Sequence, residues 1–169
     1  MNAEHVKIIK KGVEVWNGWR TENAVTPDLG GVDLRDADLG GANLRYANLG
    51  YADLRDANFG YANLGYANLG DTPLPPPSIM LLARWGRVSD KLCLELMKYD
   101  AANHPDPLSF NRWVEEGDCP YDNCRYQRSV NFTENKDLWV PIKKKVKSKS
   151  ALELVEMLLK EKTKNDDSL

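Results

Sequence analysis

The chain has 169 residues, and its 23 Lys and Arg nearly balance its 25 Asp and Glu, for a formal net charge of −2. This balance argues against a protein that binds nucleic acid through an overall basic charge. No apolar stretch approaches the roughly 18 residues of a membrane span, and the first residues lack the apolar core of a signal peptide. We therefore expect a soluble, cytoplasmic chain without membrane contact.

Residues 1–26 are expected to form a capping helix. Apolar side chains recur at helical spacing between residues 6 and 20, which predicts one amphipathic helix over this range. A membrane-surface helix is the alternative, because Lys7, Lys10 and Lys11 cluster near its start. Gly12 and Gly18 and the modest charge make a poor lipid anchor, so we favour a cap on the segment that follows.

A period of five dominates residues 27–77. Seven consecutive quintets from Ala37 to Asp71 read Ala, then Asp or Asn, then Leu or Phe, then two variable residues. An α-helix repeats every 3.6 residues and a strand every two, so neither explains the pattern. The chain must turn a corner in each quintet, as in a solenoid.

Each quintet has a central apolar residue, which we expect to fill the axis of the coil. These residues are Leu29, Leu34, Leu39, Leu44, Leu49, Leu54, Phe59, Leu64 and Leu69. The small residue two positions earlier fits a second inward position. The Asp or Asn between them suits turns, because its side chain bonds to nearby backbone. Glycine often follows the central residue, where we expect it to ease the turn.

The A(D/N)LXX quintets of residues 27–76 resemble the pentapeptide repeat family. The resemblance implies a mainly β solenoid, a right-handed quadrilateral β-helix in which four quintets make one square coil. Ten quintets then give about two and a half coils. Pro27, Val32, Thr72 and Pro73 depart from the motif, so irregular ends are expected.

If four quintets make one coil, residues twenty apart should stack. The outward pairs at this spacing are Arg35 with Arg55, Asp36 with Asp56, and Tyr46 with Tyr66. The stack would rise only about 12 Å. Its ends would expose apolar surface and unpaired edges, so association of two copies through the solenoid ends is one expectation.

Residues 78–169 carry no repeat. We divide them into a helical or irregular region over 78–140, a basic linker over 141–149, and a C-terminal helix and tail over 150–169. Helices are predicted over 79–88 and 89–103, over a short stretch that begins near Ser109, and from the Ser150–Glu153 capping box to about Lys162. Residues 163–169 are expected to be a disordered tail, and 119–139 read as turn-rich.

Three cysteines argue against a disulfide framework. Cys119 and Cys124, together with Cys93 and His104, could supply four zinc ligands, but the spacing is not that of a standard zinc finger. Ordinary reduced cysteines are the favoured interpretation, so no metal and no cofactor are expected.

Catalysis has little support in the sequence. The chain has two histidines, no recognisable nucleophile elbow and no glycine-rich phosphate loop. Asp100, Asn103 and His104 could form a site, but a helix end before a proline is the commoner meaning of this pattern. We expect no enzyme; a metal-binding or catalytic role of the C-terminal region is kept as an alternative.

Some members of the pentapeptide repeat family imitate DNA and bind type II topoisomerases such as gyrase. Such mimicry needs acidity, and residues 27–77 hold seven Asp and three Arg, a net charge of −4. A duplex carries about one charge per 1.7 Å, so about 12 Å of it would bear roughly seven. The segment is short and weakly charged for a DNA mimic, which we keep as an alternative.

Tyr46, Tyr51, Tyr61 and Tyr66 end their quintets and are predicted to point outward. With Arg35, Arg55, Asp36 and Asp56 they form a candidate interaction surface, because tyrosines bury much area at little entropic cost. Alternatively, they stack on one another and stabilise the coil. We expect a scaffold module whose protein partner is unknown, with nucleic-acid contact by the lysines of 143–149 disfavoured.

Overall fold

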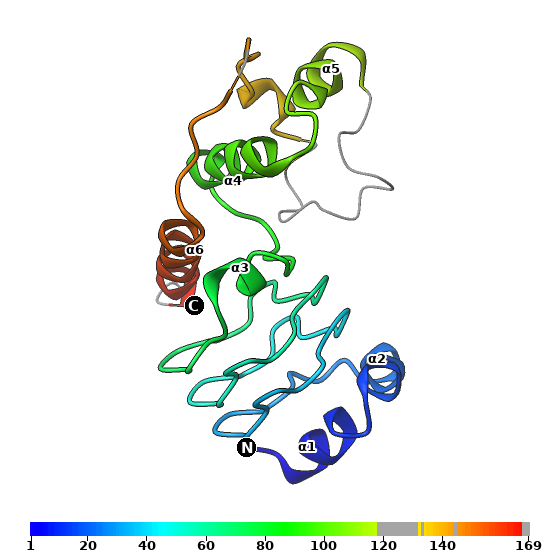
Figure 1. The fold of residues 1–169 in the computed structure, drawn as a ribbon. Coiled ribbons are helices and arrows are strands. Elements are labelled where there is room, and N and C mark those ends of the chain that lie inside the picture. Colours follow the sequence, from blue (N-terminus) through cyan, green and yellow to red (C-terminus); the bar gives the residue numbers. More distant parts are fainter. Residues whose placement is uncertain (118–131, 133, 144, 167–169) are drawn as a thin grey trace.

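The computed structural model describes residues 1–117, 132, 134–143 and 145–166. A stacked coil occupies the middle of the molecule, as Figure 1 shows. Two short helices, α1 (Ala3–Ile9) and α2 (Val13–Glu22), lie at the end of the coil where the chain starts. The remaining helices lie beyond its opposite end.

The coil has twenty residues per layer. Parallel bridges join Asp28 to Asn48, and Asn48 to Asn68. Backbone hydrogen bonds flank each bridge, because the N–H of Leu29 donates to the carbonyl of Asn48 at 2.8 Å and the N–H of Asn48 donates to the carbonyl of Pro27 at 2.8 Å. The stacking of residues twenty apart is therefore confirmed.

Each layer has four sides of one quintet each. In the first layer, side 1 is residues 27–31, side 2 is 32–36, side 3 is 37–41 and side 4 is 42–46. The second layer begins at residue 47 and the third at residue 67. The bridges of sides 1 to 4 in the first two layers are Asp28–Asn48, Asp33–Asp53, Asp38–Asn58 and Asn43–Asn63.

The predicted secondary structure of this coil is wrong. The described part of the chain contains helices, turns and isolated bridges but no β-strand or sheet, so a mainly β solenoid is not what the structure shows. The cause is local. Each side holds a single bridging residue between two turns, and the backbone never stays extended long enough to form a strand.

The fifth residue of each quintet turns the corner. In the first nine quintets this residue has φ between 52° and 73°. These nine are Gly31, Asp36, Gly41, Tyr46, Tyr51, Asp56, Tyr61, Tyr66 and Asp71, whereas Pro76 ends the tenth quintet with φ of −50°. The glycines at the fourth position lie in the same turns, directly before the fifth residue. At Gly30, glycine also leaves room, because a Cβ there would lie 3.1 Å from Nδ2 of Asn48.

The central apolar residues form the core of the coil. Those from Leu29 to Leu64 are at most 4% exposed, whereas Leu69, in the last layer, is only partly buried. The alanines at the inward position between residues 42 and 67 are also buried. Burial of each Leu or Phe contributes about 1.5–3 kcal/mol, so the axis is the main apolar core of this segment.

The N-terminal region forms two helices where the sequence predicted one. The break is at Gly12, which has φ of 108°. Helix α1 supplies His5, whose Nδ1 accepts from the N–H of Asp28 at 3.0 Å. Helix α2 supplies Trp16, whose Nε1 donates to the carbonyl of Asn43 at 2.9 Å. Both helices thus satisfy backbone groups that have no preceding layer to bond to.

The third layer is completed by residues outside the repeat. Helix α3 (Pro77–Met80) takes the place of side 3, and residues 82–86 then return over side 4. The N–H of Leu64 donates to the carbonyl of Arg84 at 2.8 Å, and Asn63 bridges to Arg84. The prediction of a helix over 79–88 is therefore wrong. The coil extends past the prolines at which the repeat in the sequence ends.

The last helices lie beyond this end of the coil. They are α4 (Asp90–Asn103), α5 (Ser109–Glu116), the 3₁₀ helix η2 (Lys136–Leu138) and α6 (Ala151–Asp166). Helix α6 packs against α3 and α4, as Figure 1 also shows.

The start of α6 is the predicted capping box. The N–H of Glu153 donates to Oγ of Ser150 at 3.3 Å, and the N–H of Ser150 donates to the Glu153 carboxylate at 2.8 Å. The helix continues to Asp166, so the predicted tail is helical over its first residues. Among the described residues, no helix has the length and apolar character needed to cross a membrane.

We expect Leu49→Ala to lower the free energy of unfolding by about 2–5 kcal/mol, because it leaves a cavity in the axis of the coil. Urea denaturation of the whole chain measures this loss. Leu152→Ala is the matched control, since Leu152 is 55% exposed and its truncation should cost no more than about 0.5 kcal/mol. Equal losses would contradict an apolar axis at Leu49.

Asn17→Ala should also destabilise the chain, by about 1–3 kcal/mol. The Asn17 side chain accepts from the N–H of Asn43 at 2.8 Å and donates to the carbonyl of Gly41 at 3.0 Å, so its loss orphans both groups. Asn103→Ala serves as control, because that side chain donates only within α4, to the carbonyl of Tyr99. If Asn103→Ala lowers the free energy of unfolding as much as Asn17→Ala does, the hydrogen bonds of Asn17 to the coil do not contribute specifically to stability.

Candidate interaction surface

Side 2 carries a network of acidic and basic side chains. Arg35 binds both carboxylate oxygens of Asp33, at 2.9 and 2.7 Å, and Arg55 binds Asp53 in the same way. Nε of Arg35 also lies 3.7 Å from the Asp53 carboxylate in the next layer. These bonds lower the pKa of Asp33 to about 2 and also lower the pKa of Asp53. The arginines neutralise both carboxylates.

Asp36 and Asp56 follow this network at the corner between sides 2 and 3. Both are exposed and both have a left-handed backbone, with φ of 57° and 60°. Neither forms a salt bridge within the described part of the chain. This corner is therefore the acidic part of the coil surface.

The corner after side 4 holds two stacked tyrosines. The rings of Tyr46 and Tyr66 are 5.1 Å apart and inclined by 16°. The guanidinium of Arg45 lies 4.7 Å from the ring centre of Tyr46 and 5.6 Å from that of Tyr66, and it donates to the Tyr46 hydroxyl at 2.9 Å. We call Arg45, Tyr46 and Tyr66 the aromatic corner.

The two other tyrosines lie elsewhere. Tyr51 is at the corner after side 1 and is 73% exposed, and Tyr61 is at the corner after side 3 and is 43% exposed. All four tyrosines point outward, but only Tyr46 and Tyr66 come together. The structure thus divides the predicted surface among separate corners.

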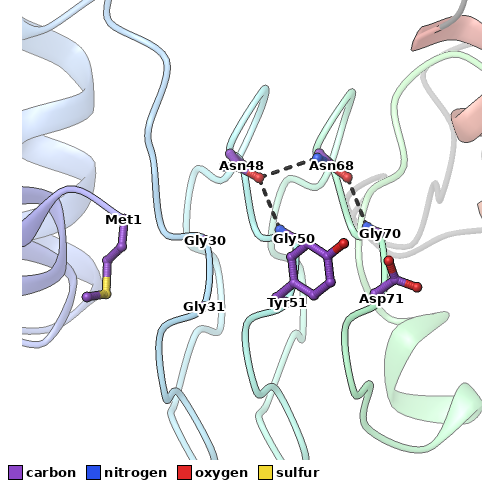
Figure 2. Close-up of a pocket in the computed structure, with 9 residues that line it drawn as sticks. All are labelled: Met1, Gly30, Gly31, Asn48, Gly50, Tyr51, Asn68, Gly70 and Asp71. Atoms are coloured by element: carbon purple, nitrogen blue, oxygen red, sulfur yellow. Dashed lines mark hydrogen bonds between the residues drawn. The ribbon is translucent and has the colours of Figure 1, made fainter.

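Side 1 is hollowed into a shallow groove of about 570 Å³, shown in Figure 2. Its floor is a column of amides, in which Oδ1 of Asn48 accepts from Nδ2 of Asn68 at 3.3 Å and from the N–H of Gly50 at 3.1 Å. Tyr51 and Asp71 stand at its rim. The amide oxygens are already occupied by these bonds, so the groove offers mainly the tyrosine ring and the Asp71 carboxylate.

Sequence reasoning missed three arginines around side 4. Arg45 occupies the same quintet position as Arg35 and Arg55, and its place before Tyr46 was the signal that could have found it. Arg20 of α2 donates to the carbonyl of Arg45 at 3.1 Å. Arg84 joins the side only because residues 82–86 complete the third layer.

The polar residues at the end of α4 make contacts with nearby parts of the chain. Asn103 bonds to the carbonyl of Tyr99, and Asp100 is buried within α4. His104 lies at the end of the helix, where its Nδ1 accepts from the N–H of Asp106 at 3.0 Å. The side chains of Asn103 and His104 therefore bond to neighbouring backbone rather than to each other.

Cys93 is buried in α4, and burial raises the pKa of its thiol to about 11. Cys119 and Cys124 lie outside the described residues, so the structure does not place the proposed zinc ligands. Within the described part of the chain, no three His, Cys, Asp or Glu side chains are grouped closely enough to hold a metal ion.

The ion pairs of side 2 predict an acid-sensitive component of stability. The lowered pKa values of Asp33 and Asp53 mean that both groups stabilise the fold above their ordinary pKa of 3.8. That contribution disappears as the pH falls through about 2, the pKa of folded Asp33. Replacing both with asparagine should flatten the fall in melting temperature between roughly pH 4 and 2.

The control removes the same number of carboxylates from the neighbouring corner, by Asp36→Asn and Asp56→Asn. This variant should retain the wild-type slope, because neither residue forms a salt bridge with the described residues. An unchanged slope in the Asp33 and Asp53 variant would contradict the role of the network.

A family model described as pentapeptide repeats, in eight copies, matches residues 28–60. Neither the curated proteins nor the solved structures gave a match to this chain. The matched residues span the first layer and the first three sides of the second layer. Residues 28–60 are therefore pentapeptide repeats, and the resemblance inferred from the A(D/N)LXX quintets is confirmed.

Proposed function

We propose that this repeat protein is a non-enzymatic protein-binding module and that the aromatic corner is its contact surface. The observation that carries the proposal is the stack of Tyr46 on Tyr66 with Arg45 against both rings. Tyrosine and arginine are the side chains that most often dominate binding energy at protein interfaces. Here both types meet on an exposed, ordered scaffold.

The backbone beneath the aromatic corner is fixed before any partner arrives. The N–H of Tyr46 donates to the carbonyl of Gly65 in the next layer at 3.0 Å, and that layer is held in turn by residues 82–86. A surface ordered in advance loses less conformational entropy on binding. This favours contact by the sides of the coil.

The ends of the coil are less suited to binding. Helices α1 and α2 cover the first layer, and α3 with residues 82–86 completes two sides of the last one. Backbone groups at these places that would otherwise be unpaired bond within one chain, which makes association of two copies through them less favourable. We therefore propose a different protein as the partner rather than a second copy joined through the coil ends.

The charge distribution does not favour the DNA-mimic alternative. Asp33 and Asp53 are paired with Arg35 and Arg55, which leaves less uncompensated charge than the count of acidic residues suggests. A duplex presents about one phosphate charge per 1.7 Å without interruption. The paired carboxylates of side 2 do not reproduce such a row.

The test compares two double variants in capture of partners from an extract of the native host. Tyr46→Ala with Tyr66→Ala removes the aromatic corner, whereas Tyr51→Ala with Tyr61→Ala removes two exposed tyrosines with the same left-handed backbone. We expect the first variant to lose capture and the control to keep it. A loss of about 2 kcal/mol per interface residue corresponds to roughly 30-fold in affinity.

Thermal melts of both variants complete the test. The alternative role of the stacked rings is to stabilise the coil, because aromatic pairs contribute about 0.5–1.5 kcal/mol beyond their area. If the Tyr46 and Tyr66 variant melts lower but captures the same partners as wild type, the rings serve stability alone and the proposed function is wrong.

A further inference from the structure

The charged residues of the coil are segregated by side. All seven of its aspartates lie on sides 1 to 3 or at the corners that follow them. Side 4 contains none in any layer: its three segments are Ala-Asn-Leu-Arg-Tyr over 42–46, Ala-Asn-Leu-Gly-Tyr over 62–66, and Leu-Ala-Arg-Trp-Gly-Arg over 82–87. An acidic coil thus has one side with only positive charge.

Three arginines gather on this side, from three parts of the chain. Arg45 belongs to the first layer and Arg84 to the third, where it bridges to Asn63 of the second. Arg20 comes from α2 and is held beside Arg45, because its guanidinium donates to the carbonyls of Arg45 and Val25 at 3.1 and 2.7 Å. We call Arg20, Arg45 and Arg84 the arginine strip.

The strip is not neutralised by the described residues. Arg45 and Arg84 are exposed, and none of the three strip arginines forms an ion pair in the described part of the chain. Arg87, which follows Arg84, differs: its guanidinium lies 2.7 Å from the Glu134 carboxylate. Side 4 therefore keeps its positive charge beside the two stacked tyrosines. On side 2, by contrast, Arg35 and Arg55 form ion pairs with aspartates.

Resting on the proposed function, we infer that side 4 binds an acidic segment of the partner protein in extended form. Arg45 and Arg84 are two layers apart, which is about 10 Å, a span that about three extended residues cover. Carboxylates of such a segment can reach both guanidinium groups, and arginine binds carboxylates through two parallel hydrogen bonds. The rings of Tyr46 and Tyr66 supply apolar contact beside Arg45.

An acidic peptide fits this surface better than a nucleic acid. The strip contains three arginines over a short distance, and the neighbouring sides carry the aspartates of a coil with net charge −4. A duplex is wide and uniformly charged, so it would meet these aspartates as well as the strip. A narrow peptide contacts side 4 alone.

The test uses a labelled peptide of about six glutamates, which is roughly 20 Å long when extended, and fluorescence anisotropy with the full chain. We expect the glutamate peptide to bind, a lysine peptide of the same length not to bind, and added salt to weaken the complex. Arg45→Ala with Arg84→Ala should weaken binding at least about tenfold, whereas Arg45→Lys with Arg84→Lys keeps the charge but loses the paired hydrogen bonds and should bind with intermediate affinity.

The matched control is Arg35→Ala with Arg55→Ala, which changes the net charge by the same amount on side 2. It should bind the glutamate peptide like wild type, and melting temperatures of all variants establish that they fold. The inference is overturned if the glutamate peptide does not bind, if the two alanine variants lose binding equally, or if a single-stranded oligonucleotide of similar length binds more tightly than the peptide.

The proposed function is tested separately from this inference. If capture of the partner depends on Tyr46 and Tyr66 but the glutamate peptide does not bind, the aromatic corner is a protein contact and its partner is not acidic. If capture does not depend on the tyrosines but the peptide binds through Arg45 and Arg84, the arginine strip acts alone and the aromatic corner is not the contact surface.

Discussion

Backbone hydrogen bonds between successive twenty-residue layers hold this molecule together. In each quintet a left-handed fifth residue turns the chain, and the residues before it face the layers above and below. Leu49 shows the arrangement: its N–H donates to the carbonyl of Asn68, and its side chain is fully buried in the axis. Because every layer needs a neighbour to satisfy its backbone, the nonrepetitive parts of the chain matter: α1 and α2 bond to the first layer, and residues 82–84 bond to the second.

The same stacking arranges the surface. Side chains that repeat every twenty residues fall into columns, so a small difference between quintets becomes a difference between whole sides. On side 2, alternating Asp and Arg form paired charges. At the corner after side 4, two tyrosines stack with an arginine. Because all aspartates belong to the other sides, a coil that is acidic overall presents one positive and aromatic side.

The region after the repeats both closes the coil and extends its surface. Helix α3 takes the place of one side of the third layer and adds a residue, so Arg84 rather than the residue before it bridges to Asn63. Helix α6 then holds this closure in place: Glu161 accepts from the N–H and the hydroxyl of Ser89, both at 2.6 Å. One end of the arginine strip thus depends on the packing of helices distant in sequence.

The sequence by itself determined the five-residue period, the axial core from Leu29 to Leu64 and the capping box at Ser150, because each is a local pattern; the twenty-residue layer was implied by the resemblance to pentapeptide repeats. The sequence failed where nonlocal bonding decides. The quintets form isolated bridges rather than strands, since each side holds one bridging residue between turns. The third layer and the approach of Arg20, Arg45 and Arg84 to one side depend on hydrogen bonds between segments that share no motif. Only the tertiary structure could bring these arginines together.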